Sequence, residues 1–194
     1  MGTRNLTVIQ LDSEYKVAQY CQWDGYPSDK GIGILEILRE GDINLIKENV
    51  SKLKSIPEEK LQSIQEQFNN DPDFFESYPH LSWDCGGPEI LRMIEENKIS
   101  ECFLNLRFAK ESIWCEWCYV IDFDKKTFEV YKGFNKKRLD KSDRFYSEDV
   151  SFESEYHPVK LLISFDLYNL PSDDLFMQSI EKRLDDLKSR NLKY

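Results

Sequence analysis

The chain has 194 residues, of which 40% are hydrophobic and 13% aromatic, and its formal net charge is −10. This apolar content is too high for a disordered polymer, so we expect a single domain over residues 1–194. The acidic balance repels phosphate backbones and argues against nucleic acid as a partner. No run approaches the ~20 apolar residues that cross a bilayer, and no apolar signal region follows the N-terminus. We therefore expect a cytoplasmic protein that does not bind membranes.

The first predicted elements form a β-hairpin. Residues 7–11 and 16–21 are β-prone runs, and a polar turn at 12–14 separates them. A loop over 22–28 follows, in which glycine and proline interrupt regular structure, and an apolar helical run begins near Gly31. The hairpin and its following loop are thus expected to precede every helix.

The middle of the chain predicts short helices. Apolar residues recur at spacings of three and four between residues 34 and 68, which indicates three helices, with Asp42 as the N-cap of the second. A fourth helix is expected to begin at Pro88. Gly86 and Gly87 precede it, where free amide groups can hold an anion, but a tight turn is the simpler interpretation.

From residue 101 onward the apolar period changes to two. Strands are expected over 102–109, 113–123 and 127–132 in a meander, followed by a segment over 134–156 that resists assignment. A strand over 159–168 and an amphipathic helix over 172–191 close the chain. The predicted fold class is α+β: an antiparallel sheet with an N-terminal β-hairpin, several short helices packed on the sheet, and a C-terminal amphipathic helix.

The cysteines and histidines offer no metal or redox motif. Five cysteines lie in segments that resemble core, so reduced, buried thiols are expected. Cys115 and Cys118 have the CxxC spacing, but residues i and i+3 of a strand point to opposite faces, so the two sulfurs are not expected to meet. His80 and His157 are isolated beside prolines and are interpreted as loop residues. We expect no metal and no cofactor.

A two-residue turn at 125–126 would place Asp122 opposite Glu129 across the predicted hairpin. Like charges that face each other need solvent, a cation or a basic partner, so this face is either solvated or a site, and the solvated interpretation is preferred. The secondary candidate residues on this face are Glu116, Asp122, Glu129 and Tyr131.

The loop after the hairpin combines four kinds of polar or aromatic side chain. Gln22, Trp23, Asp24 and Tyr26 bring an amide, an indole, a carboxylate and a phenol to the end of a buried strand. Such a mixture can orient a polar ligand against an aromatic wall. The alternative is a structural turn, in which Asp24 caps its own loop and the indole fills the core.

The N-terminal sequence Met1-Gly2-Thr3-Arg4-Asn5-Leu6, together with Gln22-Trp23-Asp24-Gly25-Tyr26-Pro27, resembles a family of uncharacterised bacterial, phage and fungal proteins. These begin Met-Gly-Thr-Arg and carry a Gln/Asn-Phe/Trp-Asp-Gly/Ser-Tyr-Pro motif. Residues 81–86 resemble the family's Asp-Thr-Gly turn, although Cys85 and Trp83 depart from it. The resemblance covers residues 1–135 and leaves the remainder as a C-terminal extension. It implies no reaction, but it links Arg4, the 22–27 loop and Asp84 as one candidate surface.

Three functions remain open at this point. The first is a small intracellular binding protein, phage or bacterial, that sequesters a polar, nucleotide-like or anionic ligand or blocks a host protein; this interpretation favours binding over catalysis. The second is an amide hydrolase with an N-terminal nucleophile, which would require cleavage before Thr3. The third is an acidic interaction module or nucleic-acid mimic that uses the net charge. The candidate ligand-binding residues of the first function are Arg4, Gln22, Trp23, Asp24, Tyr26 and Asp84.

Overall fold

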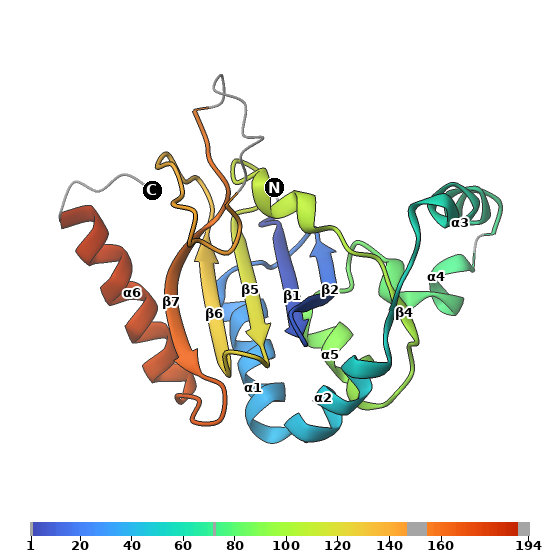
Figure 1. The fold of residues 1–194 in the computed structure, drawn as a ribbon, viewed down its shortest axis with the longest axis horizontal. Coiled ribbons are helices and arrows are strands. Elements are labelled where there is room, and N and C mark those ends of the chain that lie inside the picture. Colours follow the sequence, from blue (N-terminus) through green and yellow to red (C-terminus); the bar gives the residue numbers. More distant parts are fainter. Residues whose placement is uncertain (1, 72, 147–154, 190–194) are drawn as a thin grey trace.

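The computed structural model describes residues 2–71, 73–146 and 155–189. A five-stranded sheet with the order β2-β1-β5-β6-β7 forms its centre (Figure 1). Its strands are β1 (Asn5–Leu11), β2 (Glu14–Cys21), β5 (Trp117–Asp122), β6 (Thr127–Lys132) and β7 (Lys160–Asp166). All neighbouring strands are antiparallel except β1 and β5, which are parallel. The sheet is therefore mostly antiparallel, and the predicted α+β class is confirmed.

The predicted helices follow the hairpin in the expected order, and the short α4 is an additional one that the sequence did not predict. They are α1 (Ile32–Glu40), α2 (Ile43–Lys52), α3 (Glu58–Asn70), α4 (Phe74–Ser77), α5 (Gly87–Glu95) and α6 (Asp173–Ser189). The carboxylate of Asp42 accepts hydrogen bonds from the backbone N–H groups of Asn44 and Leu45, which confirms it as the N-cap of α2. Residues 190–191, at the end of the predicted C-terminal helix, lie outside the described residues. None of the described helices has the length and apolar character to cross a membrane.

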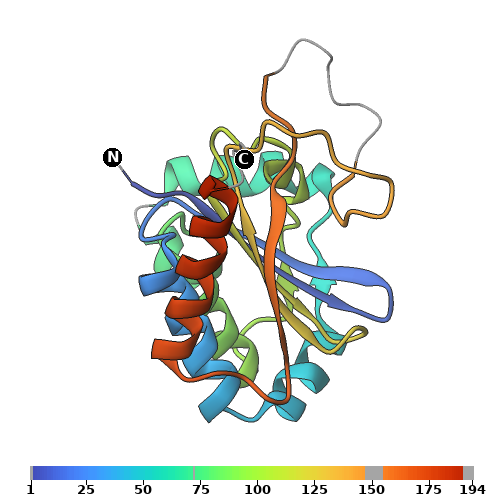
Figure 2. The same cartoon turned by 90° about the vertical axis from the view of Figure 1, so that its left-hand side faces the viewer.

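The two faces of the sheet are covered differently. Helices α1, α5 and α6 pack on one face, whereas irregular segments lie over the other (Figure 2). On the helical face, strand residues such as Ile9, Tyr119 and Phe128 contact the helices. On the opposite face, Leu6, Val8, Cys118, Val120 and Tyr131 contact Phe108, Leu139, Phe145 and Val159. The segments that cover this second face therefore form part of the core.

Two predicted strands are wrong. Of the expected 102–109 strand, the structure keeps the short β4 (Glu101–Cys102), which pairs with β3 (Lys54–Ser55), and a single parallel bridge between Leu104 and Ala18; a 3-10 helix follows at Leu106–Lys110. The strand expected over 113–123 begins only at Trp117. In the first segment Phe108 and Ala109 pack on the sheet face from a helical turn, and in the second Cys115 is buried while Ile113 and Trp114 are exposed, so apolar residues occur in both without strand geometry. Because β1 occupies the place beside β5, only the β5–β6 part of the predicted meander forms, and β7 pairs with the other edge of β6.

The pairing of β5 with β6 also differs from the prediction. Asp122 lies opposite Thr127, and Val120 lies opposite Glu129, so the connection is the four-residue turn 123–126. The cause is local: one oxygen of Asp122 accepts hydrogen bonds from the backbone N–H groups of Asp124 and Lys125, which closes the turn earlier. Since the register is displaced by two residues, both acids still point to the same face.

All five cysteines are buried and free, as predicted. Cys115 and Cys118 nevertheless lie in the same core cluster, which corrects the expectation that they point to opposite faces. Cys115 precedes β5, so the alternation of a strand does not apply to it. His80, predicted as a loop residue, lies in the short 3-10 helix Pro79–Leu81 and is buried, at 7% exposure.

Candidate functional site

Near the N-terminus, an arginine side chain lies over the ring of a tryptophan. The guanidinium of Arg4 lies 4.8 Å from the centre of the Trp114 ring. The backbone N–H of Glu116 donates to the carbonyl of Arg4 at 3.2 Å, which brings the segment of Trp114 beside the start of β1. The indole is 51% exposed, so the stacked pair is open to solvent.

Polar groups continue this surface along β2. The hydroxyl of Tyr20 donates to the side-chain oxygen of Gln22. Burial raises the pKa of Tyr20, and the nearby charge and hydrogen bonding of Arg4 oppose part of this effect. Tyr20 therefore lies close to both Arg4 and Gln22, although Arg4 precedes β1, Tyr20 belongs to β2 and Gln22 lies in the loop that follows.

The indole of Trp23 lies on the same side. A Cβ at Gly2 would be 2.2 Å from the Trp23 ring, so the absence of a side chain at Gly2 makes room for the indole. The Trp23 ring therefore lies against the backbone two residues before Arg4. The ring is 46% exposed. In this way the Met-Gly-Thr-Arg segment and the loop motif meet in space.

The loop itself is fixed by its backbone. The N–H of Gly25 donates to the carbonyl of Thr3 at 2.9 Å, and the hydroxyl of Tyr119 donates to the carbonyl of Gly25 at 2.8 Å. Asp24 adopts a left-handed φ of 55° and its carbonyl accepts from Lys30. The side chains of Asp24 and Tyr26 remain exposed. A backbone held by hydrogen bonds thus presents exposed polar side chains.

The turn that contains Asp84 adjoins the loop. The N–H of Gln22 donates to the carbonyl of Trp83 at 2.9 Å, and the thiol of Cys21 contacts the carbonyl of Asp84. The indole of Trp83 is 65% exposed. A cavity of about 160 Å³ lies beside β2; it is lined by Ala18, Gln19, Tyr20, His80, Leu81, Ser82, Trp83, Phe103 and Asn105. The turn therefore extends the surface towards a small cavity.

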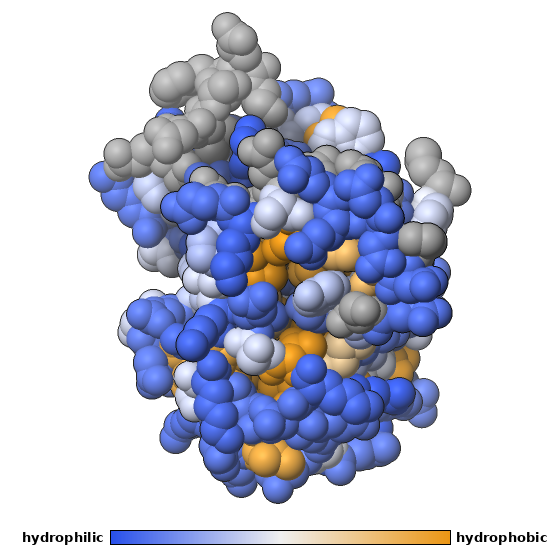
Figure 3. All heavy atoms as spheres, turned by 90° about the vertical axis from the view of Figure 1, so that its right-hand side faces the viewer, coloured by the Kyte–Doolittle hydropathy of each residue, from blue (hydrophilic) through white to orange (hydrophobic). Residues whose placement is uncertain are grey.

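The flank that carries α3 and α4 is hydrophilic over most of its area, and apolar residues show in the hollows between polar ridges (Figure 3). This differs from the N-terminal surface, where three indoles protrude. We use the name N-terminal aromatic surface for Arg4, Tyr20, Gln22, Trp23, Trp83 and Trp114. Trp114 was not predicted, because it is brought to Arg4 by packing and lies in no motif with it.

The three-part site expected from the sequence forms only in part. Gln22 is joined to Arg4 through Tyr20, and Trp23 lies against Gly2, whereas the ion pairs and hydrogen bonds of the described residues join Arg4 to neither Asp24 nor Asp84. Both carboxylates are exposed at the rim of the surface. The cation therefore faces aromatic and neutral polar groups.

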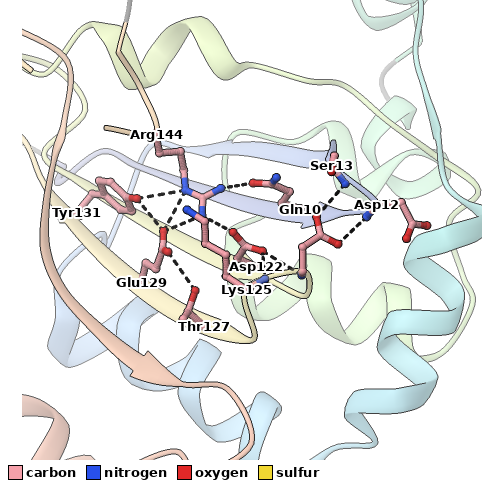
Figure 4. Close-up of polar contacts among 10 residues, drawn as sticks. Gln10, Asp12, Ser13, Asp122, Lys125, Thr127, Glu129, Tyr131 and Arg144 are labelled. Atoms are coloured by element: carbon pink, nitrogen blue, oxygen red, sulfur yellow. Dashed lines mark hydrogen bonds and ion pairs between the residues drawn. The ribbon is translucent and has the colours of Figure 1, made fainter. Parts of the chain in front are cut away.

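The secondary candidate face is buried, and a cation occupies it (Figure 4). Asp122 is fully buried and Glu129 is 5% exposed, so the preferred interpretation of a solvated face is wrong. The guanidinium of Arg144 donates to Asp122 through one nitrogen and to Glu129 at 3.0 Å through another. Its third nitrogen donates to the side chain of Gln10. This basic residue comes from the segment that resisted assignment.

Tyr131 completes this cluster, and Glu116 does not belong to it. The hydroxyl of Tyr131 donates to Glu129 at 2.7 Å and accepts from Arg144 at 3.1 Å. Burial raises the pKa of Tyr131, as does the neighbouring carboxylate. Burial alone would lower the pKa of Arg144, but its hydrogen bonds to the two acids raise it on balance. Glu116 precedes β5, and its carbonyl accepts from Lys132.

The candidate anion site at the start of α5 is filled by a side chain of the same helix. The N–H of Gly86 donates to the carboxylate of Glu89 at 2.9 Å, so the helix start at Gly86 and Gly87 is filled by an acid of α5. Glu89 also pairs with Lys30.

Within the described ranges, no group of three or more His, Cys, Asp or Glu side chains is placed to hold a metal ion. Compared with known protein families, with curated proteins and with solved structures, the chain matches none.

Proposed function

We propose that this chain is a binding protein that takes an anionic, planar ligand of the nucleotide type on its N-terminal aromatic surface. One observation carries the proposal: the guanidinium of Arg4 is stacked on the half-exposed indole of Trp114. Within the part of the chain that the structure describes, no ion pair involves Arg4. A forked cation that has no carboxylate partner among the described residues is suited to a carboxylate or phosphate of a ligand.

The surrounding side chains supply flat walls and neutral polar groups. Trp23 is 46% exposed and Trp83 is 65% exposed. The side chains of Tyr20 and Gln22 lie between Arg4 and the turn that contains Trp83 and Asp84. Indoles stack on planar rings, with a gain of about 1–3 kcal/mol per stacked base. The arrangement offers charge, stacking and hydrogen bonding without an activated nucleophile, which supports binding over catalysis.

The test uses the tryptophans as reporters. ATP, AMP and inorganic phosphate are titrated while intrinsic fluorescence is measured, and the affinity is confirmed by isothermal titration. We expect ATP or AMP to quench the emission saturably, and Arg4→Ala to weaken binding at least about tenfold, since a charge-assisted hydrogen bond contributes about 1.5–3 kcal/mol. Arg107→Ala is the matched control, because the side chain of Arg107 is 87% exposed and lies in the 3-10 helix outside this surface. Equal affinities of the two variants would contradict the proposed site.

A protein partner is the second candidate, and the type of exposed residue favours it. Tryptophan, tyrosine and arginine are enriched at the energetic centres of protein interfaces, and Trp23, Tyr26, Trp83 and Trp114 are each 46% exposed or more. Under this alternative, nucleotides and phosphate bind to no variant, whereas a partner captured on the wild-type protein is lost on Trp114→Ala and kept on Arg107→Ala.

A further inference from the structure

The guanidinium of Arg144 is bound by acceptors from three neighbouring strands. Gln10 belongs to β1, Asp122 to β5, and Glu129 and Tyr131 to β6 (Figure 4). The side chain of Arg144 is 4% exposed, and those of the two acids are 0% and 6% exposed. Together these four side chains accept hydrogen bonds from all three guanidinium nitrogens. Arginine can supply this pattern of donors and lysine cannot.

These acceptors are oriented by partners other than Arg144. One oxygen of Asp122 is held by the backbone N–H groups of Asp124 and Lys125, which leaves its second oxygen for the cation. Glu129 is held by the hydroxyl of Thr127 at 3.0 Å and by that of Tyr131 at 2.7 Å. Since the strands and their turn supply these contacts, the pocket does not depend on the cation for its shape.

The cation itself comes from an irregular segment, residues 134–146, which we name the strap. Leu139 and Phe145 are its buried apolar residues, and they pack on the sheet face that carries the acids. A cavity of about 80 Å³ remains beside the guanidinium, bordered by Glu129 and by these two side chains. The sheet side is thus regular and the strap side is loosely filled.

The charges do not balance within the cluster. Two buried carboxylates face one guanidinium, and burying such a set is seldom more stable than burying apolar side chains of similar volume. Leu139 and Phe145 already provide apolar contacts for the strap. The acids therefore confer recognition of a guanidinium beyond what attachment of the strap requires.

We propose that this pocket is a receptor for an arginine side chain of a partner protein, and that Arg144 fills it in cis while the strap is closed. When the strap opens, a guanidinium in trans takes the same four acceptors. The pocket is separate from the N-terminal aromatic surface, so the proposal stands or falls independently of the function proposed above.

The first test empties the pocket and refills it. In Arg144→Ala, ethylguanidinium at millimolar concentration is expected to raise the Tm saturably, because a ligand of the folded state stabilises it by mass action. Ethylammonium should need an at least about tenfold higher concentration for the same rise in Tm, since it lacks the planar, forked donors of a guanidinium. Trimethylamine N-oxide in all samples favours the compact state and keeps this variant folded. Equal responses to the two cations, or no response, would overturn the receptor.

Two proteins serve as controls for this titration. Wild-type protein, whose pocket is full, is expected to show no saturable rise in Tm with either cation. The triple variant Asp122→Asn, Glu129→Gln, Arg144→Ala keeps the shape of the emptied pocket without its charges. A saturable rise of the same size in the triple variant would place the binding elsewhere and overturn the proposal.

The second test asks whether the strap opens by itself. Hydrogen exchange of the wild-type protein is followed at the amides of Asn135, Lys137 and Tyr146 in the strap and of Val120 and Val130 in the strands. We expect the strap amides to exchange at least about tenfold faster, through an opening that leaves the strands protected. Exchange of both groups at one common rate would show a single cooperative unit and would overturn the displaceable strap.

Discussion

The carboxylate of Asp124, in the turn between β5 and β6, accepts a hydrogen bond of 2.8 Å from the backbone N–H of Ser13, in the turn of the N-terminal hairpin. Its other oxygen accepts from the N–H of Asp12 at the same distance. Both donors have left-handed φ values, of 64° and 55°. The two hairpin turns are therefore tied together at one end of the parallel β1–β5 pair.

Asp124→Ala is expected to lower the free energy of unfolding by about 1 kcal/mol, because the two backbone N–H groups lose a charged acceptor but remain open to water. Urea unfolding measures the effect. Glu181→Ala removes an exposed carboxylate from α6 and is expected to change stability by less than about 0.5 kcal/mol. Equal losses in the two variants would show that the tie contributes nothing.

Tyr119→Phe is expected to cost about 1 kcal/mol, because the variant removes the 2.8 Å bond to the carbonyl of Gly25 and leaves that carbonyl without its donor. Since this bond attaches the 22–27 loop to the sheet, the amide of Gly25 should also exchange faster in the variant. Hydrogen exchange resolved by residue measures this. Unaltered protection of Gly25 would mean that its bond to Thr3 fixes the loop alone.

Gly133→Ala is expected to be strongly destabilising, by about 3 kcal/mol, because the new Cβ would lie 2.0 Å from the carbonyl oxygen of Cys115 and backbone must shift. Gly31→Ala is its matched control. The nearest atom to a Cβ at Gly31 is 3.2 Å away on the ring of Tyr119, and the expected loss is below about 1 kcal/mol. Thermal unfolding of both variants compares the two glycines, and a smaller loss at Gly133 would refute the steric argument.

Stability is expected to fall as the pH rises above about 8.5. Burial raises the pKa of Cys85 and of Cys102 to about 12, whereas an unfolded thiol loses its proton near pH 8.5. Between these values the folded chain binds more protons than the unfolded chain, so each thiol lowers stability by about 1.4 kcal/mol per pH unit. Below about pH 8.5 both states are protonated and the effect vanishes.

Urea unfolding at pH 7.5, 8.5 and 9.5 measures this slope. Cys85→Ala is expected to reduce the slope above pH 8.5 by about 1.4 kcal/mol per pH unit, whatever the loss of packing does to the stability at pH 7.5. Identical slopes for the variant and the wild-type protein would mean that Cys85 titrates alike in both states.

Local patterns predicted the elements that depend on neighbours in sequence. The alternation of β1 and β2 and the polar turn between them suffice for the hairpin, and Asp42 caps α2 through its own backbone. The parallel β1–β5 pair was not predictable in this way, because no short-range pattern specifies which distant strand enters a sheet. The register of β5 and β6 was missed because the side chain of Asp122 closes the turn.

The candidate sites show the same limit. Gly2, Arg4 and the Trp23 loop stand close in sequence to one hairpin, so their association was accessible from the motif that contains them. Arg144 lies in a polar, charged segment of the sequence. Nothing in that pattern distinguishes an arginine that is 4% exposed in the fold from one that is solvated. Only the fold shows which acids receive it.

The parallel pairing of β1 with β5 also bears on how the chain is made. Asn5 aligns with Trp117 and Gln10 with Asp122, and β1 is synthesised before β5, so one edge of β1 stays open until β5 has followed it. During that interval Leu6 and Val8 lack the neighbours that bury them in the finished sheet. Until residues 117–122 have been made, the open edge of the nascent hairpin is therefore exposed to pairing with other chains.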